Sequence, residues 1–377
     1  MHHLDCRGFG CPVSVGMLIL LLCAGGAEAF HRSGVANCTS CHVMHETRDG
    51  NPVVGVDGAL LLGLSPSDVC LNCHADGDRS VFGGTPLAPP PELGAGNFIF
   101  LIEDQINDDP RPSAPSIAGH HAGHSIVAPG YGLAADPDHL TAPGGTFPSS
   151  EMGCTSCHDP HGNTNFRMLH GVGPVQGGLF DFIHPAPLAE GLPVDLPGVM
   201  ETSVSHTAYR GGMSWWCANC HDEFHDRVGD QIFEHEFNEG IGGDERDQYN
   251  IYDGDLNPAG GSALTSYLVQ VPFEDPASTT DKTSGPGSGA RVMCLTCHRA
   301  HATSAPGSTR WDMRVARLGL DGQVSGSLPL PNPYGDPNQK QLCLKCHDEY
   351  HAFNSPLSCF TCHSHSRTPD SGYGLSP

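Results

Sequence analysis

Apolar residues along this chain occur in short runs that glycine and proline interrupt, and long amphipathic patterns are scarce. Two of these runs, Phe98–Ile102 and Leu264–Val271, are typical of short strands. Short helices are expected at Asp222–Val228 and Thr309–Leu318, and at the start of each cysteine motif described below. The stretches between these elements are rich in turn-forming residues. The pattern predicts a mostly irregular fold with short α-helices and few short strands.

A longer apolar stretch, Val13–Cys23, follows a short polar start. It precedes Ala27–Ala29, a small-x-small cleavage site typical of export signals. A membrane anchor is disfavoured because about 11 apolar residues are too few to span a bilayer. A lipid anchor at Cys23 is the alternative. We expect residues 1–29 to be a cleaved signal peptide and residues 30–377 to form one mature domain without a membrane span.

Composition changes this picture in two ways. The chain contains 48 glycines and 32 prolines, and only 7% of its residues are aromatic. Although 38% of the residues are hydrophobic, this composition is poorly suited to forming an ordinary hydrophobic core. Something other than side chains should therefore supply part of the core. The formal net charge of -24 argues against nucleic-acid or anionic-membrane partners. It favours cations, oxidised metals or basic protein patches instead.

The 17 cysteines divide cleanly into two groups. Three lie in the leader, and the other 14 all belong to a C-x-x-C-H pattern that occurs seven times. The copies are Cys38/Cys41/His42, Cys70/Cys73/His74, Cys154/Cys157/His158, Cys217/Cys220/His221, Cys294/Cys297/His298, Cys343/Cys346/His347 and Cys359/Cys362/His363. This pattern is the attachment signature of c-type heme, in which two thiols bond the vinyl groups and the histidine binds the iron. It predicts seven covalently bound hemes.

Other uses of C-x-x-C fit this chain less well. Zinc knuckles do not require a histidine directly after every pair, and with 24 histidines in 377 residues seven such placements are not an accident. A thioredoxin-like redox motif predicts one copy in a βαβ setting. A disulfide framework is compatible with export, but it would not place every cysteine three residues from its partner.

The second axial ligand of each iron is expected to be another histidine. Apart from the leader and the seven proximal residues, 15 histidines remain, and several closely follow a motif. Three residues after a proximal histidine lie His45, His161 and His301, four after lie His225 and His351, and two after lies His365. A ligand so close cannot easily reach the far face of its own heme, but it can reach a neighbouring heme. Met44 is an alternative ligand, yet the histidine surplus favours bis-His coordination and low reduction potentials.

The motifs are spaced irregularly, so the chain is not a solenoid. Every Gly/Pro-rich stretch is flanked by motifs, which favours a single multiheme cytochrome domain wrapped around a row of hemes. The porphyrins would then form much of the hydrophobic core.

Several blocks resemble the OmcS-type cytochromes of the outer cell surface, and they extend well beyond the heme motifs. The blocks are Phe30–His45, Gly123–Val127, Leu140–His161, Gly212–His221, Cys294–His301 and Gln341–His347. The resemblance implies polymerisation into extracellular filaments, or nanowires, with stacked bis-His hemes. It implies that His45 is donated across the subunit interface. The other distal ligands that it suggests are His31, His124, His161, His225, His235 and His301.

The chain departs from this family at its C-terminal end. Family members have six hemes, whereas this chain adds the seventh motif at Cys359. The extra heme needs an extra ligand, for which His351 is the nearest candidate. If the seventh heme lies at the terminal contact, the family's subunit junction does not carry over unchanged.

Three functions are compatible with these observations. The favoured one is electron transport by a secreted heme protein that polymerises with itself and passes respiratory electrons from redox proteins to external acceptors such as metal oxides. The alternative is a monomeric electron carrier at the outer surface or in the periplasm. A multiheme reductase needs an iron with an open coordination site, and the histidine surplus argues against one. We therefore expect no enzymatic activity and no catalytic residues.

Overall fold

The computed structural model describes residues 38–43, 47–48, 51–52, 55–56, 59–75, 81–84, 94–102, 118–192, 200–222, 240–313, 315–321 and 330–348. Its helices are short. The α-helices are α2 (Pro66–His74), α3 (Cys154–Cys157), α4 (Met213–Cys217), α5 (Gly243–Ile251) and α6 (Cys294–Cys297). The 3-10 helices are η2 (Cys38–Ser40), η3 (Phe98–Ile102), η4 (Gly119–His121), η5 (Pro129–Tyr131), η6 (Ser149–Glu151), η7 (Phe166–Met168), η8 (Gln176–Gly178), η10 (Pro306–Ser308), η11 (Leu318–Leu320) and η12 (Leu342–Lys345).

The strands form four two-stranded antiparallel sheets within these residues. They pair β1 (Thr47–Arg48) with β2 (Asn51–Pro52), β3 (Gly55–Val56) with β4 (Ala59–Leu60), β5 (Gly173–Val175) with β6 (Phe180–Phe182), and β7 (Leu188–Glu190) with β8 (Ala208–Gly211). Everything else that is described consists of turns, bends and isolated bridges. The predicted fold class, irregular with short helices and few short strands, is confirmed.

Three of the predicted elements are wrong in type. Phe98–Ile102 forms the 3-10 helix η3 rather than a strand, and three of its residues are buried. Residues 264–271 form turns, and residues 309–318 contain turns and bridges rather than a helix. The two apolar runs lack the alternation of a strand: Phe98, Ile99 and Phe100 are all buried, whereas Leu264 is 75% exposed. The predicted helix at Asp222–Val228 lies outside the described residues except for Asp222.

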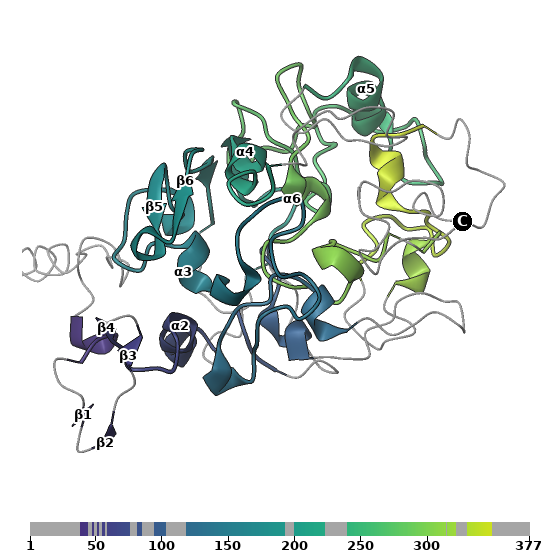
Figure 1. Cartoon of the computed structure of the whole chain (residues 1–377). Coiled ribbons are helices and arrows are strands. Elements are labelled where there is room, and N and C mark those ends of the chain that lie inside the picture. Colours follow the sequence, from purple (N-terminus) through teal and green to yellow (C-terminus); the bar gives the residue numbers. More distant parts are fainter. Residues whose placement is uncertain are drawn as a thin grey trace, which may run out of the picture.

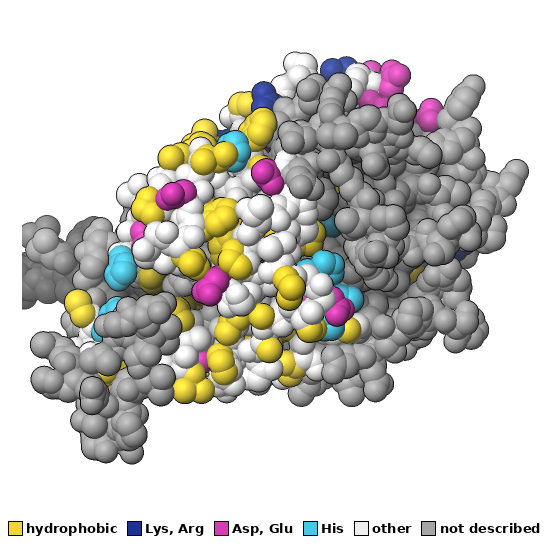
Figure 2. All heavy atoms as spheres, in the orientation of Figure 1, with side chains coloured by type: hydrophobic (Ala, Val, Ile, Leu, Met, Phe, Trp, Pro, Cys, Tyr) yellow, Lys and Arg dark blue, Asp and Glu magenta, His cyan; other side chains and the backbone are white. Residues whose placement is uncertain are grey.

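The core is divided into small clusters rather than one continuous layer. One cluster gathers around Phe98, Phe100 and Ile126, and a second around Tyr249, Phe273 and Trp311. Large apolar side chains such as Leu140 and Leu256 stay more than three-quarters exposed. Figure 2 shows apolar side chains scattered over the described part of one face. Side chains alone thus leave considerable apolar surface uncovered, which fits the expectation that another group shares the core.

The helices α2, α3, α4 and α6 lie in sequence order, whereas α5, which precedes α6 in the chain, lies outside this row. In Figure 1 the colour runs from purple at β4 through α2, α3, α4 and α6 to yellow near η12. Helix α2 contacts α3, α4 contacts α6, and α5 contacts η12. In the described part of the chain, no helix is long and apolar enough to cross a bilayer.

Candidate heme-binding array

Every described C-x-x-C-H motif includes at least one residue of a short helix, and the histidine lies at or beyond the end of that helix. In five motifs the histidine N–H donates to the carbonyl of the first cysteine, as an α-helical turn requires. The N···O distances are 2.8 Å for His42, 2.9 Å for His158, 3.1 Å for His221, 3.0 Å for His298 and 3.0 Å for His347. One turn therefore presents both sulfurs and directs the histidine away from the helix. A helix begins at, or one residue before, the first cysteine of the motifs at Cys38, Cys154, Cys294 and Cys343, as predicted, whereas α2 begins four residues before Cys70 and α4 ends at Cys217.

Two pairs of motifs meet through their first cysteines. Cys70 and Cys154 are hydrogen-bonded through their side chains, as are Cys217 and Cys294. We call these contacts the α2–α3 joint and the α4–α6 joint.

The same serine contact supports both joints. The backbone N–H of Cys154 donates to Ser67 Oγ at 3.2 Å, and that of Cys294 donates to Ser214 Oγ at 3.1 Å. Each serine lies three residues before the first cysteine of its own motif. The repeated S-x-x-C spacing was a sequence signal for this contact that the motif search missed.

The remaining neighbouring motifs interact electrostatically through their second cysteines. Burial raises the pKa of Cys157 to about 12, and the adjacent Cys220 adds to the shift. Burial and then Cys297 likewise raise the pKa of Cys346 to about 12. Burial and then Cys73 raise the pKa of Cys41. In a heme-loaded chain these sulfurs are thioethers and no longer titrate, but the motifs remain neighbours. The six motifs follow one another in sequence order, and the neighbours interact alternately through their first and their second cysteines.

The motifs at Cys154 and Cys294 continue into loops of the same construction. The Nδ1–H of His158 donates to the carbonyl of Arg167 at 2.8 Å, and that of His298 donates to the carbonyl of Gly307 at 2.9 Å. Both acceptors lie nine residues further along. Left-handed backbone at Arg167 (φ 50) and Gly307 (φ 63) turns both loops back toward their motifs.

These hydrogen bonds matter because they define the free nitrogen of each ring. A histidine whose Nδ1–H is bound to a carbonyl has an unprotonated Nε2, the atom that binds a metal. The same arrangement occurs at His221, bonded to the carbonyl of Pro143 at 2.7 Å, and at His124, bonded to that of Ala300 at 2.6 Å. The sequence could not predict these carbonyl partners. Some are far away in the chain, and a backbone carbonyl acceptor is not marked by any particular residue type.

Three predicted proximal histidines face three predicted distal ones. The ring centroids of His42 and His161 are 6.4 Å apart with an interplanar angle of 3°. Those of His158 and His301 are 6.5 Å apart, and those of His124 and His221 are 6.0 Å apart. A metal ion bound at about 2 Å from each of two imidazole nitrogens places the ring centroids roughly 6 Å apart. The spacing of all three pairs therefore fits an iron between the rings.

Burial keeps several of these rings neutral. It is the largest cause that lowers the pKa of His301 to about 3, and it also lowers the pKa values of His124 and His158. A neutral imidazole is the form that binds a metal. The residues thus fit the heme group that the motifs imply, both in donor type and in spacing.

Some predicted residues lie outside the described part of the chain. They are the distal candidates His31, His45, His225, His235 and His351, and the whole seventh motif, Cys359, Cys362 and His363.

Helical C-x-x-C-H motifs that touch one another in series define a c-type cytochrome with several covalently attached hemes. A family model described as "Doubled CXXCH motif" matches residues 147–176, which contain the motif at Cys154 and its return loop.

The chain is 29% identical to the C-type cytochrome OmcS of Geobacter sulfurreducens, covering 90% of this chain and 99% of the relative. The structure is similar to the outer membrane cytochrome S filament of Geobacter sulfurreducens, with a TM-score of 0.68, 27% identity and coverage of 84% of this chain and 99% of the other. It is also similar to the OmcS nanowires from that organism, with a TM-score of 0.69, 26% identity and the same coverage. The predicted resemblance to the OmcS-type cytochromes is confirmed.

Proposed function

We propose that this protein is a secreted electron-transfer subunit that polymerises into an extracellular filament. The observation that carries the proposal is the series of interacting motif cysteines from Cys41 to Cys346, in which α2 contacts α3 and α4 contacts α6. Such a series suits conduction along a chain, and the similarity to solved OmcS filaments supports the assembly. A head-to-tail contact that does not close into a ring gives a filament.

The heme group would supply a one-electron iron couple, while the residues of the chain bind and enclose it. We propose bis-His ligation, with His161 opposite His42, His301 opposite His158, and His124 opposite His221. The centroid spacings support these pairs, and so does the desolvation that lowers the pKa of His301. Two histidines on one iron leave no open position for a substrate, so electron transfer is favoured over reduction of a bound molecule. Bis-His ligation without methionine also favours low potentials.

Two of the three pairs follow a rule that can be extended to the ends of the chain. The histidine that trails the third motif faces the proximal residue of the first motif, and the one that trails the fifth faces that of the third. His45 trails the first motif, so its own chain offers no motif two places earlier. We propose that its iron belongs to a neighbouring subunit.

The same rule applies to the C-terminal end. His365 trails the seventh motif and would pair with His298 of the fifth, although it follows after two residues rather than three. The alternation of cysteine contacts would place Cys359 against Cys343. His351 is proposed for the iron at His363. A seventh heme bound this way would occupy the end of the array and alter the subunit junction.

We propose that residues 1–29 are removed on export and that residues 30–377 form the mature domain. Redox proteins would donate electrons, and external oxidised metals would accept them at a surface of high negative charge. Intact mass of the secreted protein tests both the cleavage after Ala29 and the heme count. A mass equal to six hemes would refute heme attachment at Cys359.

Electron microscopy of the secreted protein tests the assembly. Heme-containing fibres are expected for the wild type, and His45→Ala should impair fibre formation more than folding of the subunit. His124→Ala, a change at an intrachain pair, serves as the control for general loss of a ligand. Normal fibres from His45→Ala would refute the cross-subunit ligand. A monodisperse wild-type monomer would favour the periplasmic or outer-surface carrier instead.

A further inference from the structure

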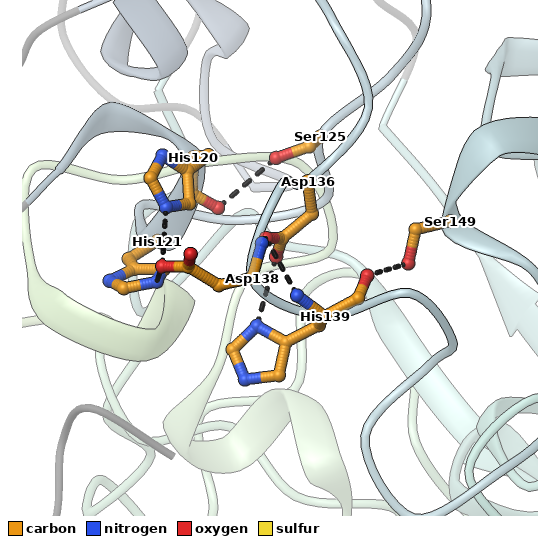
Figure 3. Close-up of polar contacts among 7 residues, drawn as sticks. All are labelled: His120, His121, Ser125, Asp136, Asp138, His139 and Ser149. Carbon is orange, nitrogen blue, oxygen red and sulfur yellow. Dashed lines mark hydrogen bonds and ion pairs between the residues drawn. The ribbon is translucent and has the colours of Figure 1, made fainter. Parts of the chain in front are cut away.

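A second group of metal-binding side chains lies apart from the proposed axial pairs. His120 and His121 end the turn of η4, and Asp136, Asp138 and His139 come from a nearby loop (Figure 3). Oδ2 of Asp138 lies 3.0 Å from Nε2 of His120 and 3.0 Å from Nε2 of His121. One carboxylate oxygen thus faces two imidazole nitrogens at once.

The backbone around these side chains is held in place by its own hydrogen bonds. Asp136 Oδ1 accepts from the N–H of Asp138 at 2.8 Å and from that of His139 at 3.0 Å. Ser125 Oγ donates to the carbonyl of His120 at 3.1 Å, and Ser149 Oγ donates to the carbonyl of His139 (Figure 3). The loop and the turn are therefore organised before any ligand arrives, which lowers the entropic cost of binding.

The donor atoms have the spacing of a metal site. The ligand atoms of His120, His121 and Asp136 all lie within 4.8 Å of one another. An ion at about 2 Å from each ligand places opposed donors up to about 4 Å apart, so a small inward movement of the side chains completes coordination. Imidazole and carboxylate together suit zinc and other first-row divalent ions.

His139 makes a further contact that orients the carboxylate of Asp136. Nδ1 of His139 lies 3.0 Å from Oδ2 of Asp136. A metal-bound carboxylate or histidine commonly has such an outer partner, which sets its orientation. Side-chain exposures are only 15% for His121 and 16% for Asp136, so both ligands are partly withdrawn from water.

We propose that His120, His121, Asp136 and Asp138 bind one divalent transition-metal ion, such as Zn²⁺, that is separate from the heme irons. The ion would replace the protons that the two imidazoles now share with Asp138, and the two carboxylates would balance its charge. Neither similarity to the OmcS proteins nor the heme motifs assign such a site.

The position of the site gives the ion a structural role. His124 follows His121 by three residues and faces His221 in one proposed axial pair. η4 also contacts η10, where the carbonyl of Gly307 orients His298. An ion at η4 would therefore fasten the segment that lies between two neighbouring heme positions.

Equilibrium dialysis of the heme-loaded protein against Zn²⁺, followed by elemental analysis, tests the proposal. We expect one zinc per chain in addition to the heme iron. His121→Ala and Asp136→Asn should abolish or greatly weaken binding, and His139→Ala, which removes only the outer partner, should weaken it by about tenfold. His184→Ala is the control, because His184 contacts Trp215 in another part of the chain and should leave binding unchanged.

Two results would overturn the proposal. One is zinc binding that is absent from the wild type or equally strong in His121→Ala and His184→Ala. The other is a high-spin heme signal in His121→Ala with no change in zinc, which would make this imidazole an iron ligand. Because the assay does not depend on polymerisation, it gives the same answer for a monomer and for a fibre.

Discussion

The α2–α3 and α4–α6 joints differ in the side chain that caps their first helix. Both need a hydrogen-bond acceptor at the start of the first helix, where backbone N–H groups lack partners. In α2 this role falls to residues of the same turn: Ser65 Oγ accepts from the N–H of Asp68 at 3.1 Å and donates to its Oδ2 at 3.0 Å. In α4 it falls to Glu274, whose Oε1 accepts from the N–H of Met213 at 2.5 Å.

The difference has an energetic consequence. Asp68 is buried, but both of its oxygens have partners, since Oδ1 also accepts from the N–H of Gly130 at 2.9 Å. Glu274 is 1% exposed, and its Oε2 has no hydrogen-bond partner among the described residues. Burial raises the pKa of Glu274, although the N–H groups of Met213 and Gly212 oppose this shift. The α4–α6 joint, which is capped by a residue distant in sequence, therefore has the cost of burying a carboxylate with one unpaired oxygen. The α2–α3 joint, which is capped within its own turn, avoids this cost.

The largest effect is expected from the residue that links the two joints. His301 follows α6 but faces His158, which follows α3. His301→Ala should leave the iron at His158 with one ligand, giving a high-spin signal and binding of carbon monoxide. It should also cost about 2–3 kcal/mol of stability, because the partly buried ring stacks on Phe98 with 4.5 Å between the ring centroids.

His161→Ala is the matched change, since His161 trails its motif by the same interval. It should give the same spectroscopic change at the iron of His42 with a much smaller loss of stability, because its side chain is 82% exposed. Electron paramagnetic resonance and guanidinium unfolding measure the two quantities separately. A low-spin spectrum in both variants would refute the proposed pairs.

The next effect concerns the carboxylate that caps α4. The folded-state pKa of Glu274 is raised above its ordinary value of 4.5, so its stabilising contribution is complete below that value and is lost as the pH rises through the folded-state pKa. The free energy of unfolding, followed by Soret absorbance in guanidinium, should fall over this range. Glu274→Gln should flatten the dependence. Glu274→Ala should cost about 2 kcal/mol because the Met213 N–H loses its acceptor. An unchanged pH dependence in Glu274→Gln would contradict this account.

The two joints also show what the sequence could predict. The motif positions, their helices and the Ser65–Asp68 cap are local patterns, so they can be identified without coordinates. Glu274 could not be assigned, because 61 residues separate it from Met213 and nothing in its neighbourhood indicates a cap. The sequence could not assign each distal histidine to its iron for the same reason. Candidates such as His124 and His301 were identified, but their partners depend on how distant loops fold back. Phe98–Ile102 was mistaken for a strand because three consecutive buried residues in a tight turn, Phe98, Ile99 and Phe100, leave no helical period to recognise.

The smallest expected effect tests whether the joints are equivalent units. Ser67→Ala and Ser214→Ala each remove one acceptor from the backbone N–H of the neighbouring cysteine, so each should cost about 1 kcal/mol. The two sites lie in different joints and share no partner, so the double variant should lose the sum of the single losses. Guanidinium unfolding of the four proteins measures this. Equal and additive losses would mean that the serine contact works independently of how the helix is capped. A larger loss for Ser214→Ala would mean that the contact compensates for the buried charge of Glu274, and the joints would then differ in mechanism as well as in origin.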